Sequence, residues 1–168
     1  PDLTKEEQAA IESTVKQTVD QIDQRMSTWK DDSELSLLNR HGATPYEVSS
    51  ELMGVLVSAA EIHRITGGAF DITVEPLVRA YGFGPDAPPE IPEESELKEL
   101  LSRTGLRKLV LNPDAGTVTK KHPELHCDLS GIAKGYAVDQ VVSALEELGQ
   151  LDFMVEIGGE IRTRGRNG

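Results

Sequence analysis

DLSGIAKGYA, residues 128–137, decides the fold, because it joins an expected strand to an expected helix. TGGAFDITV, residues 66–74, makes the opposite step, from a helix that ends at Gly67 into an extended, β-branched run. Each stretch sets glycines and one carboxylate at the junction, and glycine lets a ligand approach the backbone because it has no Cβ. The N-terminus of the helix in the first stretch can also bind a phosphate. The two junctions therefore indicate a phosphate-bearing ligand held by backbone groups and a few carboxylates.

The spacing of apolar residues predicts the helices. They are expected at residues 6–26, 33–39, 94–103 and 132–148, with one more that Ser49 or Ser50 caps and that runs to residue 65. Asp32 or Ser33 is expected to cap the second of these helices. Ser130 is expected to cap the last one, which Gly149 ends.

Extended runs predict short strands between the helices. They are expected at residues 72–74, 109–111, 117–119, 125–129, 153–157 and 160–163, and residues 81–92 are expected to form a loop. Helices and strands are mixed without a strict βαβ alternation. The expected fold class is therefore α+β, with packed helices and a mixed, largely antiparallel sheet.

The composition is that of one globular domain. The 168 residues are 38% hydrophobic and 27% charged, and no apolar run is long enough to cross a bilayer. The formal net charge of −12 would repel a nucleic acid, so nucleic-acid binding is set aside. An acidic protein needs local cations to bind a phosphate, such as Lys, Arg, a helix N-terminus or Mg2+.

Several candidate site residues also have a simple structural interpretation. Asp128 is placed to meet a ligand, although an ordinary strand–loop–helix junction would also explain it. Asp71 taken alone is more typical of a turn. Trp29, the only tryptophan, can stack on a planar ligand, but its pattern alone favours partial burial against the first helix. Cys127, the only cysteine, is expected to be a small buried residue.

The histidines define neither a zinc site nor a nucleophile. His126 and Asp128 would share one face of a strand, and Cys127 would point away from them. A tetrahedral zinc site would then need ligands from elsewhere, and the chain has no second Cys/His pair. His41 and His63 have no recognisable nucleophile beside them.

Five blocks of the sequence together resemble the FAD:protein FMN transferases, the ApbE family. The blocks are residues 26–29 with 32–36 and 39, 66–74 with 76–77, 81–84, 128–137 with 139, and 156–161. The resemblance implies an ApbE-like fold related to the T-fold. It also implies an Mg2+-dependent enzyme that cleaves FAD, transfers FMN to a threonine of a partner flavoprotein and releases AMP. Hydrolysis of FAD to FMN and AMP, or FAD binding without catalysis, are the alternatives.

The resemblance also carries roles onto particular residues. It implies that Trp29 contacts the flavin, that the Gly131 carbonyl binds the metal, and that further residues bind FAD. The further residues are Ala69, Phe70, Asp71, Asp128 and Lys134. No residue is a convincing general base.

The resemblance covers the first part of the family's length. Residues 1–168 are therefore expected to be the N-terminal part of an ApbE-like domain. The catalytic residues and most of the metal site are expected in a C-terminal half. By the same resemblance, the protein is expected at the periplasmic face of the inner membrane, on a lipid anchor outside these residues.

Overall fold

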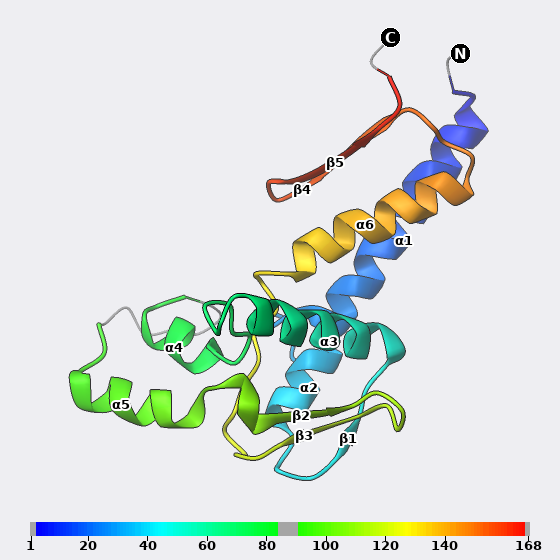
Figure 1. Ribbon diagram of the computed structural model, residues 1–168. Coiled ribbons are helices and arrows are strands. Elements are labelled where there is room, and N and C mark those ends of the chain that lie inside the picture. The colour runs from blue at the N-terminus through cyan, green and yellow to red at the C-terminus, as the bar shows by residue number, and fades with distance from the viewer. Residues whose placement is uncertain (1–2, 84–90, 167–168) are drawn as a thin grey trace. The chain divides into compact units, whose positions relative to one another are not determined.

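The computed structural model describes residues 3–83 and 91–166, which form two compact units (Figure 1). The first unit consists of Pro1–Gln24 and Ile132–Gly168, and the second of Arg25–Gly131. In the described part of the chain, no helix has the length and apolar character needed to cross a membrane.

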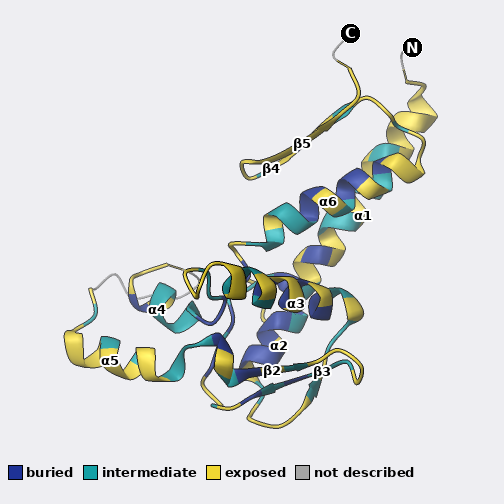
Figure 2. Cartoon of the chain, viewed as in Figure 1, coloured by how far each residue is buried: buried dark blue, intermediate teal, exposed yellow. Residues whose placement is uncertain are grey.

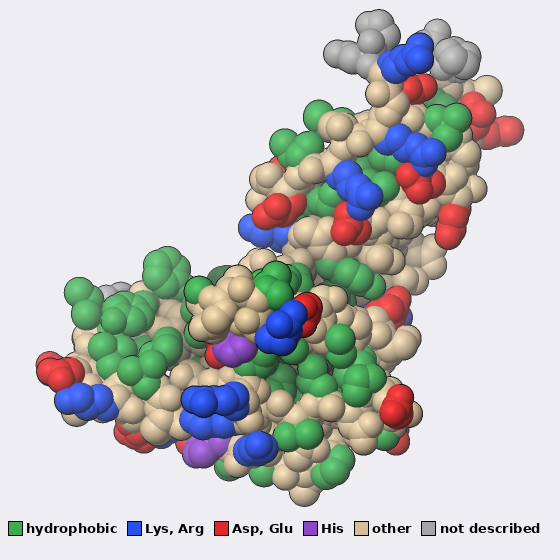
Figure 3. Space-filling model, viewed as in Figure 1, with side chains coloured by type: hydrophobic (Ala, Val, Ile, Leu, Met, Phe, Trp, Pro, Cys, Tyr) green, Lys and Arg blue, Asp and Glu red, His purple; other side chains and the backbone are tan. Residues whose placement is uncertain are grey.

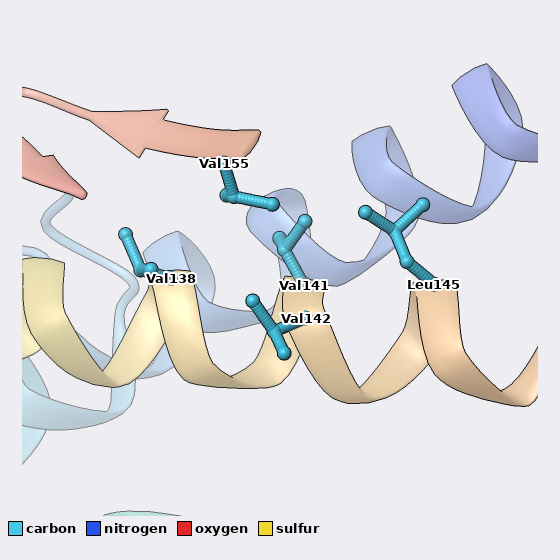
Figure 4. Close-up of a cluster of buried hydrophobic side chains, with 5 residues drawn as sticks. All are labelled: Val138, Val141, Val142, Leu145 and Val155. Atoms are coloured by element: carbon cyan, nitrogen blue, oxygen red, sulfur yellow. The ribbon is translucent and has the colours of Figure 1, made fainter. Parts of the chain in front are cut away.

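The first unit packs a long helix and a hairpin against helix α6. Its elements are α1 (Lys5–Met26, which ends in the second unit), α6 (Ala133–Glu147), β4 (Phe153–Ile157) and β5 (Glu160–Arg164). Strands β4 and β5 pair antiparallel, as the sequence predicts. The buried centre is formed by Val138, Val141, Val142, Leu145 and Val155 (Figure 4), against which Ile11, Val15 and Val19 of α1 pack.

Helix α6 ends as predicted but begins differently. Gly149 follows it with a φ of 76°, in the left-handed region that glycine adopts readily. The prediction that Ser130 caps α6 is wrong, because Ile132 stands at the N-cap and makes no side-chain bond there. The backbone N–H and hydroxyl of Ser130 instead donate to Oδ1 of Asp128, at 2.7 and 2.5 Å. The nearby carboxylate thus makes a local turn that competes with capping.

The second unit combines helices with a three-stranded antiparallel sheet. Its helices are α2 (Glu34–Arg40), α3 (Ser50–Ile65), α4 (Glu75–Ala80), α5 (Glu94–Arg103) and the 3-10 turn Leu106–Lys108. Its strands are β1 (Tyr46–Glu47), β2 (Leu109–Asn112) and β3 (Thr117–Lys120), in the order β1-β3-β2. Ser33 caps α2 and Ser49 caps α3, as predicted. Each cap begins a helix that buries apolar residues, and the buried positions are dark blue in Figure 2.

The expected strand at residues 72–74 is wrong. These residues form a turn that leads into α4, a helix that the sequence reading did not predict. Oδ1 of Asp71 accepts bonds from the backbone N–H and the hydroxyl of Thr73, at 2.8 and 2.6 Å. Pro76 then stands in the first turn of α4, where its missing N–H costs nothing.

The expected strand at residues 125–129 is also wrong, although its side chains alternate as predicted. Leu125, Cys127 and Leu129 are fully buried, while His126 and Asp128 are partly exposed. The amide side chain of Asn39 makes the backbone hydrogen bonds that a neighbouring strand would make. Nδ2 of Asn39 donates to the Cys127 carbonyl at 2.9 Å, and its Oδ1 accepts from the Cys127 N–H at 2.8 Å.

A buried lysine completes this arrangement. Lys120 is 1% exposed, and its Nζ donates to the carbonyls of Asn39 at 2.6 Å and Pro123 at 2.9 Å. Burial lowers the pKa of Lys120, because removal from water disfavours the charged form. Asn39 is thus held between Lys120 and Cys127. In the predicted loop, residues 84–90 lie outside the described residues, and its other residues form no helix or strand.

Cys127 is expected to be inert in the folded protein. Burial raises the pKa of its thiol to about 12, so the reactive thiolate is scarce at pH 8. A maleimide or disulfide reagent at pH 8 should therefore label native protein slowly and guanidinium-unfolded protein at once. Mass spectrometry over time checks this, and rapid labelling of native protein would contradict the burial.

Candidate functional site

A hollow of about 340 Å3 in the second unit brings together residues from three segments; we call it the Trp29 hollow. The segment through α2 contributes Thr28, Trp29, Asp31, Ser36, Asn39 and Arg40. Helix α4 and the residues after it contribute Glu75, Val78, Arg79 and Phe83, and the irregular segment 125–129 contributes His126 and Asp128. Two residues named from the sequence, Trp29 and Asp128, therefore line one hollow.

Two aromatic side chains at the Trp29 hollow are largely exposed. Trp29 is 71% exposed and Phe83 is 67% exposed, so the interpretation of Trp29 as partly buried against the first helix is wrong. The hydroxyls of Ser33 and Ser36 both donate to the Ser27 carbonyl, which fixes the turn that carries Trp29. Aromatic faces left in water at a hollow suit stacking on a planar ligand.

The hollow carries charges of both signs. Arg40 donates to the backbone carbonyl of Asp31, and its Nη1 lies 3.9 Å from the Asp31 carboxylate. Nδ1 of His126 lies 3.2 Å from Oε2 of Glu75, which joins the 125–129 segment to α4. Rings and guanidinium groups in one hollow fit a ligand that has a planar ring system and phosphates.

Within the second unit, residues 70–72 of one glycine-containing stretch contact residues 128–131 of the other. The Asp128 N–H donates to the Ile72 carbonyl at 2.7 Å. A Cβ at Gly131 would lie 3.1 Å from Cε2 of Phe70, so the ring packs directly on the glycine. Nδ1 of His63 donates to the Phe70 carbonyl at 2.7 Å and holds this turn from α3. This role was not assigned to His63 from the sequence. The contact depends on how the chain turns back toward Phe70 after the end of α3.

The Asp71 carboxylate accepts hydrogen bonds from other groups of the protein. Besides its two bonds to Thr73, its Oδ2 accepts from the Leu106 N–H at 3.0 Å and lies 3.6 Å from Nδ1 of His63. The turn that the residue type favours is confirmed. The Asp71 carboxylate thus bonds to Thr73 and Leu106 and lies beside His63, and neither it nor Ala69 nor Phe70 lines the Trp29 hollow.

Lys134 belongs to the first unit, unlike the other predicted site residues. Its side chain lies over the turn between β4 and β5. A Cβ at Gly158 would lie 3.0 Å from Cδ of Lys134, and Gly158 has a φ of 57°. The absent side chain at Gly158 therefore makes room for the Lys134 stem.

The described residues do not form a complete metal site by themselves. Among them no group of three or more His, Cys, Asp and Glu side chains is arranged to hold a metal ion. The Gly131 carbonyl, which is exposed, stays a predicted single ligand. A complete Mg2+ site would need donors from outside the described residues.

Comparisons with known proteins show the family to which the chain is similar. The ApbE family model matches residues 2–168. The FAD:protein FMN transferase of Haemophilus influenzae is 44% identical over 87% of this chain and 44% of its own length. That of Vibrio cholerae is 40% identical over 94% of this chain and 47% of its own. The chain thus spans about half the length of the curated relatives it matches.

Solved structures show the same fold. The flavin transferase ApbE from Vibrio cholerae superposes with a TM-score of 0.90 at 40% identity, over 94% of this chain and 51% of that one. The apo flavinyl transferase ApbE of Pseudomonas stutzeri gives 0.88 at 29% identity, over 95% and 50%. The expected α+β class is confirmed, and the fold is that of the flavin transferases. The chain belongs to the ApbE family.

Asp128→Asn is expected to weaken ligand retention without unfolding the protein. Asparagine keeps the Oδ1 that accepts from Ser130, so the loss of unfolding free energy should stay below about 1 kcal/mol. The lost negative charge should weaken retention of FAD or Mg2+ several-fold. Isothermal titration beside a denaturation curve measures both effects. Wild-type retention in this variant would remove Asp128 from the site.

Proposed function

We propose that this chain is part of an Mg2+-dependent flavin transferase. The enzyme cleaves FAD, attaches FMN through a phosphoester to a threonine of a partner flavoprotein and releases AMP. The observation that carries the proposal is the Trp29 hollow, where two exposed rings and two guanidinium groups meet beside Asp128. The relatives named FAD:protein FMN transferase support flavin as the ligand.

The residues of this chain bind and orient FAD in the proposal. Trp29 stacks on the isoalloxazine ring, and Asp128 accepts a hydrogen bond from the ligand. The further contacts that the family resemblance supports are Ala69, Phe70, Asp71 and Lys134. The Gly131 carbonyl contributes one ligand to Mg2+, which polarises phosphoryl oxygens when it is bound. The general base for the threonine hydroxyl is not assigned to any residue of this chain.

The same resemblance supports a place for the whole protein. It favours the periplasmic face of the inner membrane, with a lipid anchor, and an acceptor flavoprotein that carries the target threonine.

A single assay tests the function. The whole protein is incubated with FAD and a threonine-bearing acceptor peptide, first with Mg2+ and then with EDTA, and a peptide with alanine for threonine is the control. An FMN-sized mass gain on the threonine peptide alone, lost with EDTA, is expected. Free FMN and AMP without labelling would instead indicate an FAD diphosphatase. Intact FAD would leave only a binding protein.

A further inference from the structure

Arg79 differs from Arg40, the other arginine that lines the Trp29 hollow, because no described residue pairs with it. It lies in the last turn of α4, is exposed and lines the hollow. In the described part of the chain, no hydrogen bond or ion pair engages its guanidinium group. Arg107, which lies outside the hollow, likewise has no such partner among the described residues, whereas four arginines of the second unit are paired: Arg25 with Glu51, Arg40 with Asp31, Arg64 with Glu61, and Arg103 with Glu99 and Glu124.

The lack of a partner has a structural cause. Glu75 precedes Arg79 by four residues on α4, and a glutamate in that position normally pairs with the arginine. Here Oε2 of Glu75 lies 3.2 Å from Nδ1 of His126 instead. His126 therefore draws the carboxylate away, and no other residue in the described part of the chain takes its place beside the Arg79 guanidinium.

A phosphate ligand needs an available cationic side chain in order to bind to this acidic protein. The chain has a formal net charge of −12, and Asp31, Glu75 and Asp128 all line the hollow. On the face shown in Figure 3, both basic and acidic side chains are scattered over the surface. Arg40 is already engaged by Asp31. The fork of a free guanidinium matches phosphate oxygens in a bidentate way.

We propose that Arg79 contacts the phosphate groups of the ligand and lets the Trp29 hollow distinguish FAD from a flavin without phosphate. The proposal rests on the proposed function, because that function makes FAD the ligand. In this arrangement the rings bind the planar part of the ligand, and Arg79 selects its diphosphate.

The test compares two ligands that share the flavin ring. The whole protein is titrated with FAD and with riboflavin, as wild type and as Arg79→Gln, Arg79→Lys and Arg107→Gln. Arg79→Gln should bind FAD about tenfold more weakly and riboflavin as before, because only a charge-assisted phosphate bond is lost. Arg79→Lys should lie between, since lysine keeps the charge without the fork. Arg107 is exposed and outside the hollow, so Arg107→Gln is the control for lost charge.

The outcomes separate this proposal from the proposed function. Equal weakening of FAD and riboflavin, or FAD binding unchanged, would overturn the role of Arg79 while the peptide assay still reports transfer. Arg107→Gln weakening FAD as much as Arg79→Gln would reduce the effect to net charge and would also overturn it. A wild-type protein that binds no FAD would overturn both.

Discussion

Asn39→Ala lowers the free energy of unfolding by about 2–5 kcal/mol in our expectation, because it leaves two buried backbone groups without partners. The Asn39 amide is the partner of both the N–H and the carbonyl of Cys127, in a segment that has no neighbouring strand at that point. Cys127 is fully buried, so water cannot replace the lost bonds without opening the unit. The affected segment also carries His126 and Asp128 into the Trp29 hollow.

Chemical denaturation of the whole protein measures this effect. Asn112→Ala is the matched control, because Asn112 is exposed and its Oδ1 accepts one bond, from the Ala115 N–H at 3.3 Å. It should cost less than about 1 kcal/mol. Asn39→Asp should be destabilised as well, since a carboxylate can accept from Cys127 but cannot donate to it. Equal stability of Asn39→Ala and the control would show that the segment 125–129 is held by other contacts.

Trp29→Ala is expected to weaken FAD binding by about 10- to 100-fold, the usual effect of removing one aromatic stacking partner. The side chain is 71% exposed, so the free energy of unfolding should hardly change. A loss of binding without a loss of stability would separate a ligand contact from a packing role. Trp29→Tyr keeps an aromatic face and should retain most of the affinity.

A whole protein in which Trp29 is the single tryptophan offers a second measurement of the same placement. Trp29 is the only tryptophan of the chain, so its emission can be followed in a protein whose other tryptophans, if any, are replaced. Stacking on the isoalloxazine should quench this emission as FAD is added. Unchanged emission at saturating FAD would contradict the placement of Trp29 against the flavin.

Elements defined by local signals were predictable from the sequence. The serine caps at Ser33 and Ser49 and the hairpin around the turn 112–116 depend on neighbours in the chain, and they are confirmed. The strand expected at 125–129 is wrong because its bonding partner, Asn39, is distant in sequence, and the strand expected at 72–74 is wrong because Asp71, two residues before Thr73, forms a turn there. The carboxylate of Asp71 and the amide of Asn39 take the place of strand partners there.

The site was predictable to a similar extent. Trp29 and Asp128 were identified from motifs, and both line the hollow. Arg79 and Phe83 were missed because α4 brings them to the hollow. That helix was not predicted, since residues 72–74 before it were interpreted as a strand. Pro76 was the available signal, since proline favours the first turn of a helix.

The division into two units has a consequence for synthesis on the ribosome. The second unit is continuous in sequence, so it can complete its contacts once residue 131 has emerged. The first unit is interrupted, because α1 is made before the second unit and its partners α6 and β4 are made after it. Ile11, Val15 and Val19 of α1 therefore wait for Val138, Val141 and Leu145 while the whole second unit is translated. During that interval the nascent chain carries an uncovered apolar stripe, the kind of surface that chaperones bind.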